Sequence, residues 1–212
     1  MQLNSGKIST KITAHLFISA IMLIIGSALA QAQDSPGRVE VGGSLTAVRD
    51  FATPTLGVGA EGDFNFGRHF ALDSAIDWLP TTSSSANTLV GLFGAKAGIR
   101  KERFGYFLKV RPGFVTSSNV FRSSTTIVTD NTVSGFSTHN ARLTQPTLDL
   151  GGVIEYYPAS HWALRWDVGD MLIFQETLFT NIEVLNGQTS VQSFPGKTTN
   201  NFRFSTSLHY RF

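Results

Sequence analysis

The chain has 212 residues, with 17 Lys and Arg against 15 Asp and Glu, and it contains no Cys. This near balance of charge argues against a nucleic-acid partner, and the lack of Cys excludes disulfides and argues against a lipoprotein. The length suits one domain once a targeting segment is removed.

The first 32 residues have the composition of a secretory signal peptide. Two lysines precede an apolar run over residues 16–30, and small residues follow at the spacing of a cleavage site. The run is shorter than the roughly 20 residues that a membrane-spanning helix needs, so we prefer a cleaved signal to an anchor. Cleavage follows Ala30 or Ala32. With the two lysines removed, the remaining domain, residues 33–212, holds 15 basic and 15 acidic residues.

The rest of the chain alternates apolar and polar residues, which is the pattern of strands exposed to different surroundings on their two faces. The predicted strands, in chain order, are residues 39–47, 56–66, 70–78, 89–100, 104–114, 147–157, 162–169 and 202–212. Tight turns alternate with longer connections, two of which have about 30 residues. Short periplasmic turns and long extracellular loops are typical of outer-membrane barrels. The sequence therefore predicts an all-β, eight-stranded antiparallel up-and-down transmembrane barrel.

Charge decides which face of each strand points inward. One face carries all of the strand charges, and the opposite face carries none. In a bilayer a Lys or Arg on the lipid face at midplane costs roughly 2–4 kcal/mol, so we place the charged face in the lumen. The predicted lumen charges are Glu40, Glu61, Asp63, Asp73, Asp77, Lys96, Arg100, Lys109, Arg111, Asp149, Glu155, Arg165, Asp167, Arg203 and Arg211.

These acids and bases can pair almost one to one, as buried charges require. Glycines on the same face, Gly42 among them, leave room for long side chains. The alternation is imperfect, because the inner face also holds Val48, Val90, Leu92, Phe107 and Val153. An eight-stranded barrel is only wide enough to be filled by side chains. We interpret the lumen as a plug of ion pairs, and a narrow porin-like path for ions or small solutes is the alternative.

Aromatic residues on the lipid face gather near the two ends of the strands, as expected for membrane interfaces. The set near the tight turns is Phe64, Phe66, Phe70, Tyr106, Tyr156, Trp162, Tyr210 and Phe212, and the set near the long loops is Trp78, Phe114, Phe202 and Phe204.

With its signal peptide, eight strands, loop pattern and final "LHYRF", the sequence resembles the small OmpA/OmpX-like bacterial outer-membrane barrels. The resemblance implies location in the outer membrane among phospholipid and lipopolysaccharide. It also implies recognition by the outer-membrane assembly machinery, with Leu208, Tyr210 and Phe212 matching the terminal signal that this machinery reads. The resemblance does not imply an activity, because such barrels serve as tethers, adhesins, narrow channels and enzymes.

Some barrels of this size modify lipid A with a His and a Ser. The comparable residues here are His139 near Ser137 and Asp130, together with His161, His209 and His69. Their spacing places no base beside a nucleophile on one rigid element, so we predict no catalytic residues, no metal and no cofactor.

A structural, adhesive or surface-interaction role is the expected function, with the long loops available to an extracellular ligand. The first long loop, residues 115–146, is rich in Ser, Thr and Asn and predicts a solvated loop. The second, residues 170–200, contains many apolar residues. We prefer a hairpin that prolongs the neighbouring strands to a loop that meets a partner surface.

Overall fold

The computed structural model describes residues 38–49, 54–80, 87–129, 132–175, 179–185 and 188–212. The predicted signal peptide lies outside these residues. The described part of the chain forms ten strands: β1 Val39–Arg49, β2 Pro54–Asn65, β3 Phe70–Pro80, β4 Asn87–Arg100, β5 Phe104–Thr129, β6 Thr132–Ala159, β7 Trp162–Phe174, β8 Phe179–Leu185, β9 Gln188–Phe194 and β10 Thr198–Arg211. No helix among the described residues is long and apolar enough to cross a membrane.

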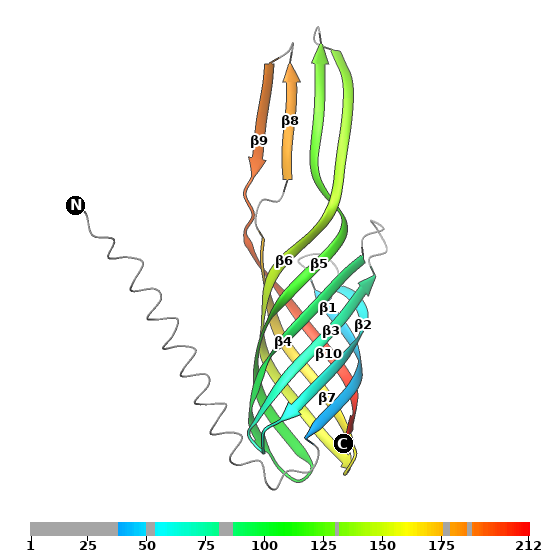
Figure 1. Cartoon of the computed structure of the whole chain (residues 1–212), viewed down its shortest axis with the longest axis vertical. Coiled ribbons are helices and arrows are strands. Elements are labelled where there is room, and N and C mark those ends of the chain that lie inside the picture. Colours follow the sequence, from blue (N-terminus) through cyan, green and yellow to red (C-terminus); the bar gives the residue numbers. More distant parts are fainter. Residues whose placement is uncertain (1–37, 50–53, 81–86, 130–131, 176–178, 186–187) are drawn as a thin grey trace, which may run out of the picture.

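Within the described chain, eight of these strands close into a ring (Figure 1). Neighbours follow the order β4-β3-β2-β1-β10-β7-β6-β5, and pairing of β4 with β5 completes the circle. The first strand pairs antiparallel with the last, from Glu40 opposite Arg211 to Arg49 opposite Phe202. Closure leaves no open sheet edge within the barrel, which a bilayer demands of a spanning sheet. The predicted eight-stranded barrel is confirmed.

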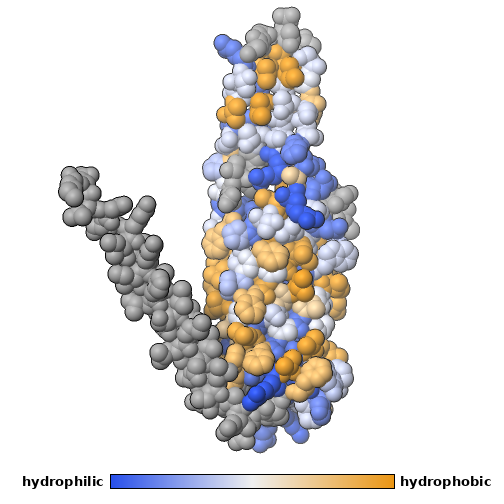
Figure 2. Space-filling model, in the orientation of Figure 1, coloured by the Kyte–Doolittle hydropathy of each residue, from blue (hydrophilic) through white to orange (hydrophobic). Residues whose placement is uncertain are grey.

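The alternation of the sequence appears directly in the burial of each strand. In β3, for example, buried and more exposed residues alternate along all eleven positions from Phe70 to Pro80. Large apolar side chains such as Leu45, Phe93 and Leu108 are more than half exposed on the outside. Figure 2 shows the hydrophobic band on the face of the barrel in view. The outer face is therefore suited to lipid.

Aromatic side chains cluster at the end of the barrel that carries the three tight turns and the carboxyl terminus, here called the turn end. Phe104 lies 5.1 Å from Tyr156 between ring centroids, and Tyr210 lies 5.3 Å from Trp162 and 4.9 Å from Phe212. Aromatic rings prefer the boundary between lipid and water. In barrels of this class the short turns face the periplasm, so we assign the turn end to that side.

The prediction of a solvated first loop is wrong. Residues 115–129 and 132–146 instead continue β5 and β6 as a long antiparallel hairpin that rises above the barrel (Figure 1). The pairing shifts register between Ser117 and Val120, and Asn119 has a positive φ of 56°. Asn tolerates this left-handed conformation, and such irregularities bend a strand pair. The β-branched run from Thr125 to Val128 explains why this polar stretch forms a strand.

The second long connection forms a hairpin, as predicted. β8 and β9 pair antiparallel, with Phe179 opposite Phe194. β8 also pairs in parallel with β5, from Ser123 opposite Thr180 to Val128 opposite Leu185. The sequence pattern did not predict this second pairing. The upper parts of β5 and β6 (residues 120–129 and 132–141) together with β8 and β9 thus make one four-stranded sheet, which we call the arm.

Candidate functional site

The charged residues predicted for the lumen lie inside the barrel. All are buried except Arg100, whose side chain is 10% exposed. Every acid of the set has a basic partner within 4.0 Å, and every base has an acidic one. We call these residues the interior charge network.

The network begins at the turn end of the barrel. Arg211 Nε donates a hydrogen bond of 3.1 Å to Glu40 Oε1, and Arg100 Nη2 lies 3.5 Å from the same oxygen. Arg100 also contacts Glu155 at 3.2 Å and donates to the Tyr157 hydroxyl at 2.7 Å. Tyr157 in turn donates to Glu155. The first and last strands are therefore tied to β4 and β6 across the ring.

Arg165 is the centre of the network. Its Nη2 lies 2.7 Å from Asp73 Oδ2 and 3.1 Å from Asp167 Oδ2, while its Nη1 lies 3.1 Å from Asp63 Oδ2. Its Nε is 3.5 Å from Glu61 Oε2. A planar guanidinium with five donors suits such multiple contacts better than a Lys would. One side chain from β7 thus connects acids on β2, β3 and β7.

Two cations from β5 extend the network upward. Lys109 Nζ donates to Asp149 at 2.6 Å and to Asp167, and Arg111 contacts both of these acids. Arg111 also lies 3.2 Å from Asp73. The groups from β3, β5, β6 and β7 therefore meet in the interior.

Lys96 and Arg203 complete the set. Lys96 bridges Asp63, at 3.1 Å, and Glu155, while Arg203 Nη2 donates to Asp77 at 2.7 Å. Taking an ion out of water costs several kcal/mol unless its partner and hydrogen bonds compensate. The pairing of every predicted charge therefore offsets the free-energy cost of burying these ions in the barrel.

An apolar cluster lies inside the barrel, where the strands approach the long connections. It contains Ala75, Leu79, Val90, Leu92, Val115 and Met171, with Val48 and Ile173 packed against it. The sequence pattern placed Val48, Val90 and Leu92 inside, but it missed Leu79, Val115 and Met171. The predicted strands stopped one or two residues before each of these side chains. The strands are longer than the alternation of charge indicated.

Two adjacent glycines of β1 test the packing of the interior. A Cβ on Gly42 would meet the His209 ring at 2.5 Å, whereas a Cβ on Gly43 would meet nothing within 4 Å. Overpacking typically costs about 1–3 kcal/mol. We expect Gly42→Val to lower the urea midpoint of the barrel in lipid vesicles, while Gly43→Val leaves it nearly unchanged. Equal midpoints for the two variants would contradict this assignment of faces.

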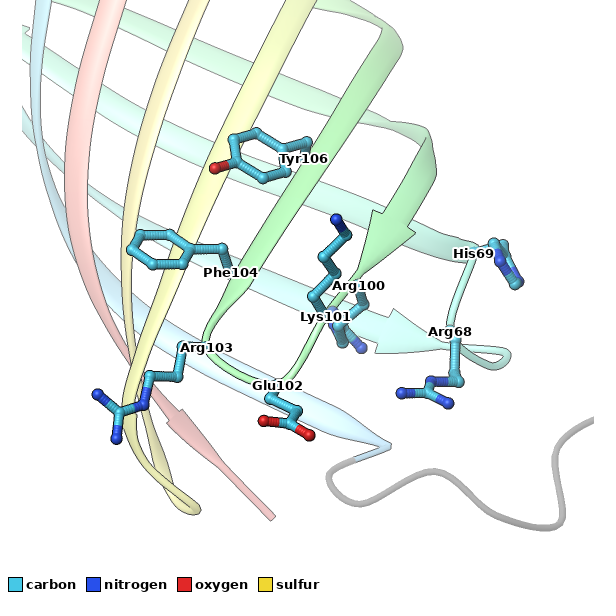
Figure 3. A pocket seen from close by; sticks show the side chains of 8 residues that line it. All are labelled: Arg68, His69, Arg100, Lys101, Glu102, Arg103, Phe104 and Tyr106. Atoms are coloured by element: carbon cyan, nitrogen blue, oxygen red, sulfur yellow. The ribbon is translucent and has the colours of Figure 1, made fainter.

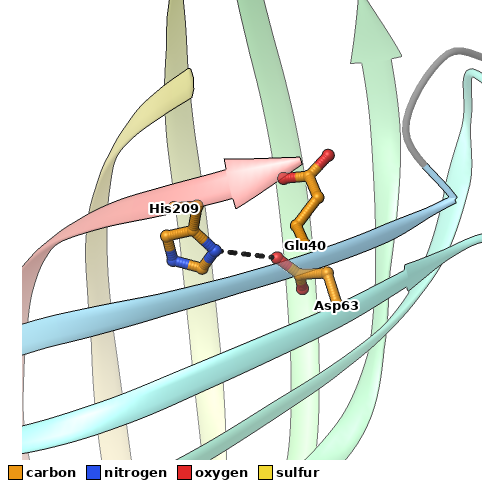
Figure 4. Close-up of side chains that lie close together, drawn as sticks. All are labelled: Glu40, Asp63 and His209. Atoms are coloured by element: carbon orange, nitrogen blue, oxygen red, sulfur yellow. Dashed lines mark ion pairs between the residues drawn. The ribbon is translucent and has the colours of Figure 1, made fainter. Parts of the chain in front are cut away.

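Glu40, Asp63 and His209 form a compact group inside the turn end (Figure 4). Each offers one ligand atom, and these atoms lie within 4.8 Å of one another. However, Asp63 Oδ2 already lies 3.1 Å from both Lys96 and Arg165. A divalent cation would be repelled by these side chains. We interpret the group as part of the interior charge network.

The other histidines considered for catalysis lie on three separate elements, the arm and two different turns. His139 is exposed on the arm, two residues from Ser137 on the same strand, while Asp130 lies outside the described residues. His161 is exposed at the turn between β6 and β7, and His69 is exposed at the start of β3. The structure does not bring these residues together.

The structure does bring Ser207 and His209 to Glu61, a grouping that sequence spacing missed. Ser207 Oγ lies 2.9 Å from His209 Nε2, and Glu61 Oε2 lies 3.2 Å from the same nitrogen. A catalytic triad needs its acid on the other ring nitrogen, and all three residues here are buried. The other nitrogen, Nδ1, makes no hydrogen bond to a described residue, and Asp63 Oδ2 lies 3.7 Å from it. The arrangement therefore lacks the acid–histidine hydrogen bond that would activate the serine. The acid is 148 residues from the histidine, so spacing along the chain could not reveal the contact.

The residues of the predicted assembly signal line the outer face of β10 and the chain end. Leu208 is 47% exposed, Tyr210 39% and Phe212 69%. The Phe212 amide donates to the Val39 carbonyl at 2.9 Å, so the last residue still pairs with the first strand. These three side chains are accessible from outside the barrel at the turn end.

The arm presents a polar groove and scattered apolar residues. The groove, of about 280 Å³, is lined by Ser124, Thr126, Asn181, Ile182, Glu183, Ser190 and Gln192. Ser124 donates to Asn181 at 2.7 Å and so fixes one wall of the groove. Phe136 and Val191 are at least 60% exposed nearby in the sheet. Figure 2 shows hydrophobic patches on this part of the molecule, above the band of the barrel.

An apolar exterior, a paired charged interior and a closed ring define an integral membrane β-barrel. The chain belongs to the outer membrane protein beta-barrel domain family, which matches residues 18–212. This membership locates the protein in the outer membrane of a Gram-negative bacterium. No curated protein matches the chain significantly.

Several solved structures resemble this barrel. Neisserial surface protein A is 10% identical with a TM-score of 0.49, and the match covers 84% of this chain and 98% of that one. Ail, the attachment invasion locus protein of Yersinia pestis, is 11% identical with a TM-score of 0.46, covering 82% and 96%. The N-terminal β-barrel domain of Pseudomonas aeruginosa OprF is 12% identical with a TM-score of 0.44, covering 83% and 99%.

Proposed function

We propose that this protein is a non-conducting, non-enzymatic outer-membrane barrel that holds a rigid β-sheet arm outside the cell for adhesion to an extracellular surface. The observation that carries the proposal is the continuity of β5 and β6. Each runs without interruption from the turn end of the barrel into the arm. A sheet that shares its strands with a membrane-anchored barrel is held at a fixed distance and orientation, as binding surfaces on rigid scaffolds are.

Support for the adhesive role comes from the composition of the arm. Its groove offers hydroxyl, amide and carboxylate groups, and its exposed aromatic and aliphatic residues offer apolar contact. Binding surfaces combine apolar anchors with a few polar groups that fix orientation. The strand β9 also has a free edge in the described sheet, where an extended segment of a partner could pair.

Shortening the arm tests the proposal directly. Residues 119–141 are replaced by Asn-Gly, a two-residue turn that suits the pairing of Ser117 with Leu143. We expect cells that display this variant to lose most of their retention on protein-coated and host-cell surfaces. Phe136→Ser keeps the whole arm and serves as the milder comparison. Undiminished retention by the shortened protein, at equal surface levels and unchanged gel mobility of unboiled samples, would overturn the adhesive role.

The narrow channel remains the second candidate, and a bilayer recording separates it from the proposed function. An eight-stranded barrel has an interior that side chains can fill, and here ion pairs and the apolar cluster occupy it. We expect planar bilayers with the purified protein to show little or no conductance. A large, stable conductance that disappears when the protein is omitted would show that the barrel is a channel and that its interior is not plugged.

A further inference from the structure

A basic pocket lies outside the barrel wall at the turn end, between the β2–β3 turn and the β4–β5 turn (Figure 3). It has a volume of about 770 Å³, within the usual range for ligand sites. Its lining residues are Arg68, His69, Arg100, Lys101, Glu102, Arg103, Phe104 and Tyr106. It is separate from the arm and from the interior charge network, apart from the shared Arg100.

The charge of this pocket is not neutralised by the rest of the described protein. Arg100 already contacts Glu40 and Glu155 inside the barrel. Arg68, Lys101 and Arg103 are exposed and form no ion pair with any described residue. Glu102 is the single acid of the lining. Three cationic groups on two short turns therefore remain available to an anion.

The upper wall of the pocket is aromatic and faces outward. Phe104 is 41% exposed and Tyr106 is 53% exposed, and their rings are stacked with centroids 6.4 Å apart. Leu108 and Ile99 continue this apolar surface, with 75% and 57% of their areas exposed. Figure 3 shows the two rings on β5 above the charged turns. The basic turns are thus directly adjacent to an apolar surface that faces the lipid.

We propose that this pocket binds an anionic glycerophospholipid of the inner leaflet, with its phosphate at the basic turns that carry Arg68, Lys101 and Arg103 and its acyl chains along Phe104 and Tyr106. Aromatic residues mark the headgroup level of a membrane, and Lys and Arg side chains reach from there to phosphate oxygens. Arg can hold phosphate with two parallel hydrogen bonds. A free anion would use only the basic half of the pocket, whereas a phospholipid uses both halves.

Native mass spectrometry of the full-length, signal-cleaved protein tests this assignment. The protein is taken from bilayers of equal parts phosphatidylglycerol and phosphatidylcholine with identical acyl chains, and the retained lipid is identified. We expect preferential retention of phosphatidylglycerol. In the variant Arg68→Ser/Lys101→Ser/Arg103→Ser, the preference for phosphatidylglycerol over phosphatidylcholine should fall about fivefold for each charge removed. Equal retention of the two lipids by the unaltered protein would overturn the proposal.

Two matched variants identify why the triple Ser variant loses its preference for phosphatidylglycerol. Arg68→Lys/Lys101→Arg/Arg103→Lys keeps all three charges and should keep the preference. Arg122→Ser/Arg142→Ser/Lys197→Ser removes the same residue types from the opposite end of the molecule and should also keep it. An equal loss of the phosphatidylglycerol preference in this second variant would show that the lipid responds to the total charge of the protein, and it would overturn the proposed site. Unboiled gel mobility establishes that each variant is folded.

Soluble glycerol 3-phosphate distinguishes a phospholipid from a small anion. It carries the phosphate without acyl chains, so we expect it to leave the retained phosphatidylglycerol in place at millimolar concentration. Phe104→Ala/Tyr106→Ala should weaken lipid retention without creating a response to the soluble phosphate. Displacement of the lipid by glycerol 3-phosphate would show that the pocket binds free anions and would overturn the proposed lipid site.

Discussion

Replacing Arg165 with Met is expected to lower the free energy of unfolding by about 3–5 kcal/mol, because it leaves buried carboxylates without their shared cation. Asp63, Asp73 and Asp167 each lie within 3.1 Å of this guanidinium. Lys96, Lys109 and Arg111 still contact these acids, but none of them reaches all three. Urea unfolding in lipid vesicles, followed by the mobility of unboiled samples on gels, measures the change.

Two further variants separate the role of the network from a general effect of losing an arginine. Arg142→Met alters an exposed residue of β6 and should leave stability unchanged. Arg165→Met/Asp73→Asn removes one of the carboxylates that lost Arg165 and should recover part of the lost stability, since residues in contact are energetically coupled. If Arg165→Met were as stable as the unaltered barrel, the network would not hold the interior together.

Deleting Phe212 is expected to reduce the amount of assembled protein in the outer membrane several-fold while changing the stability of the folded barrel little. The side chain is 69% exposed and its ring contacts Tyr210, so few contacts of the fold are lost. A strong effect in cells would then come from recognition by the assembly machinery, as we propose for Leu208, Tyr210 and Phe212. Outer-membrane fractionation and vesicle refolding measure the two quantities.

The control for this deletion is the removal of Ser83–Ser85 from a polar connection, which should leave outer-membrane levels unchanged. Phe212→Trp keeps an aromatic terminus and should assemble normally. Equal outer-membrane levels for the Phe212 and Ser83–Ser85 deletions would contradict the assembly signal.

The barrel could be predicted from the sequence because lipid imposes a strict rule on every second residue. A charge on the outer face is costly, so fifteen charged positions identify the inner face without any knowledge of pairing. The partners themselves could not be predicted. Arg165 meets Asp63 across 102 residues, and this contact depends on the register of strands that are not neighbours in the sequence.

The β5–β6 part of the arm could not be predicted, for the opposite reason. Outside the bilayer both faces of a sheet meet water, so no alternation marks the strands. The stretch "SSTTIVTD" is polar, and only its β-branched residues indicate extended structure. The parallel pairing of β5 with β8 leaves no local signature, because it joins segments 57 residues apart.

Closure of β1 against β10 also makes the pairing of the interior charges depend on correct assembly. A chain paired one residue out of register would turn its lumen charges toward lipid, since a shift of one reverses the face of every side chain. A ring lacking its last strand would leave Asp77 without Arg203 and would remove Arg211 from Glu40. Incomplete or misaligned barrels therefore carry exposed ions that the membrane rejects. We therefore expect the residues that fill the interior to favour the complete, correctly aligned ring over partial barrels in the bilayer.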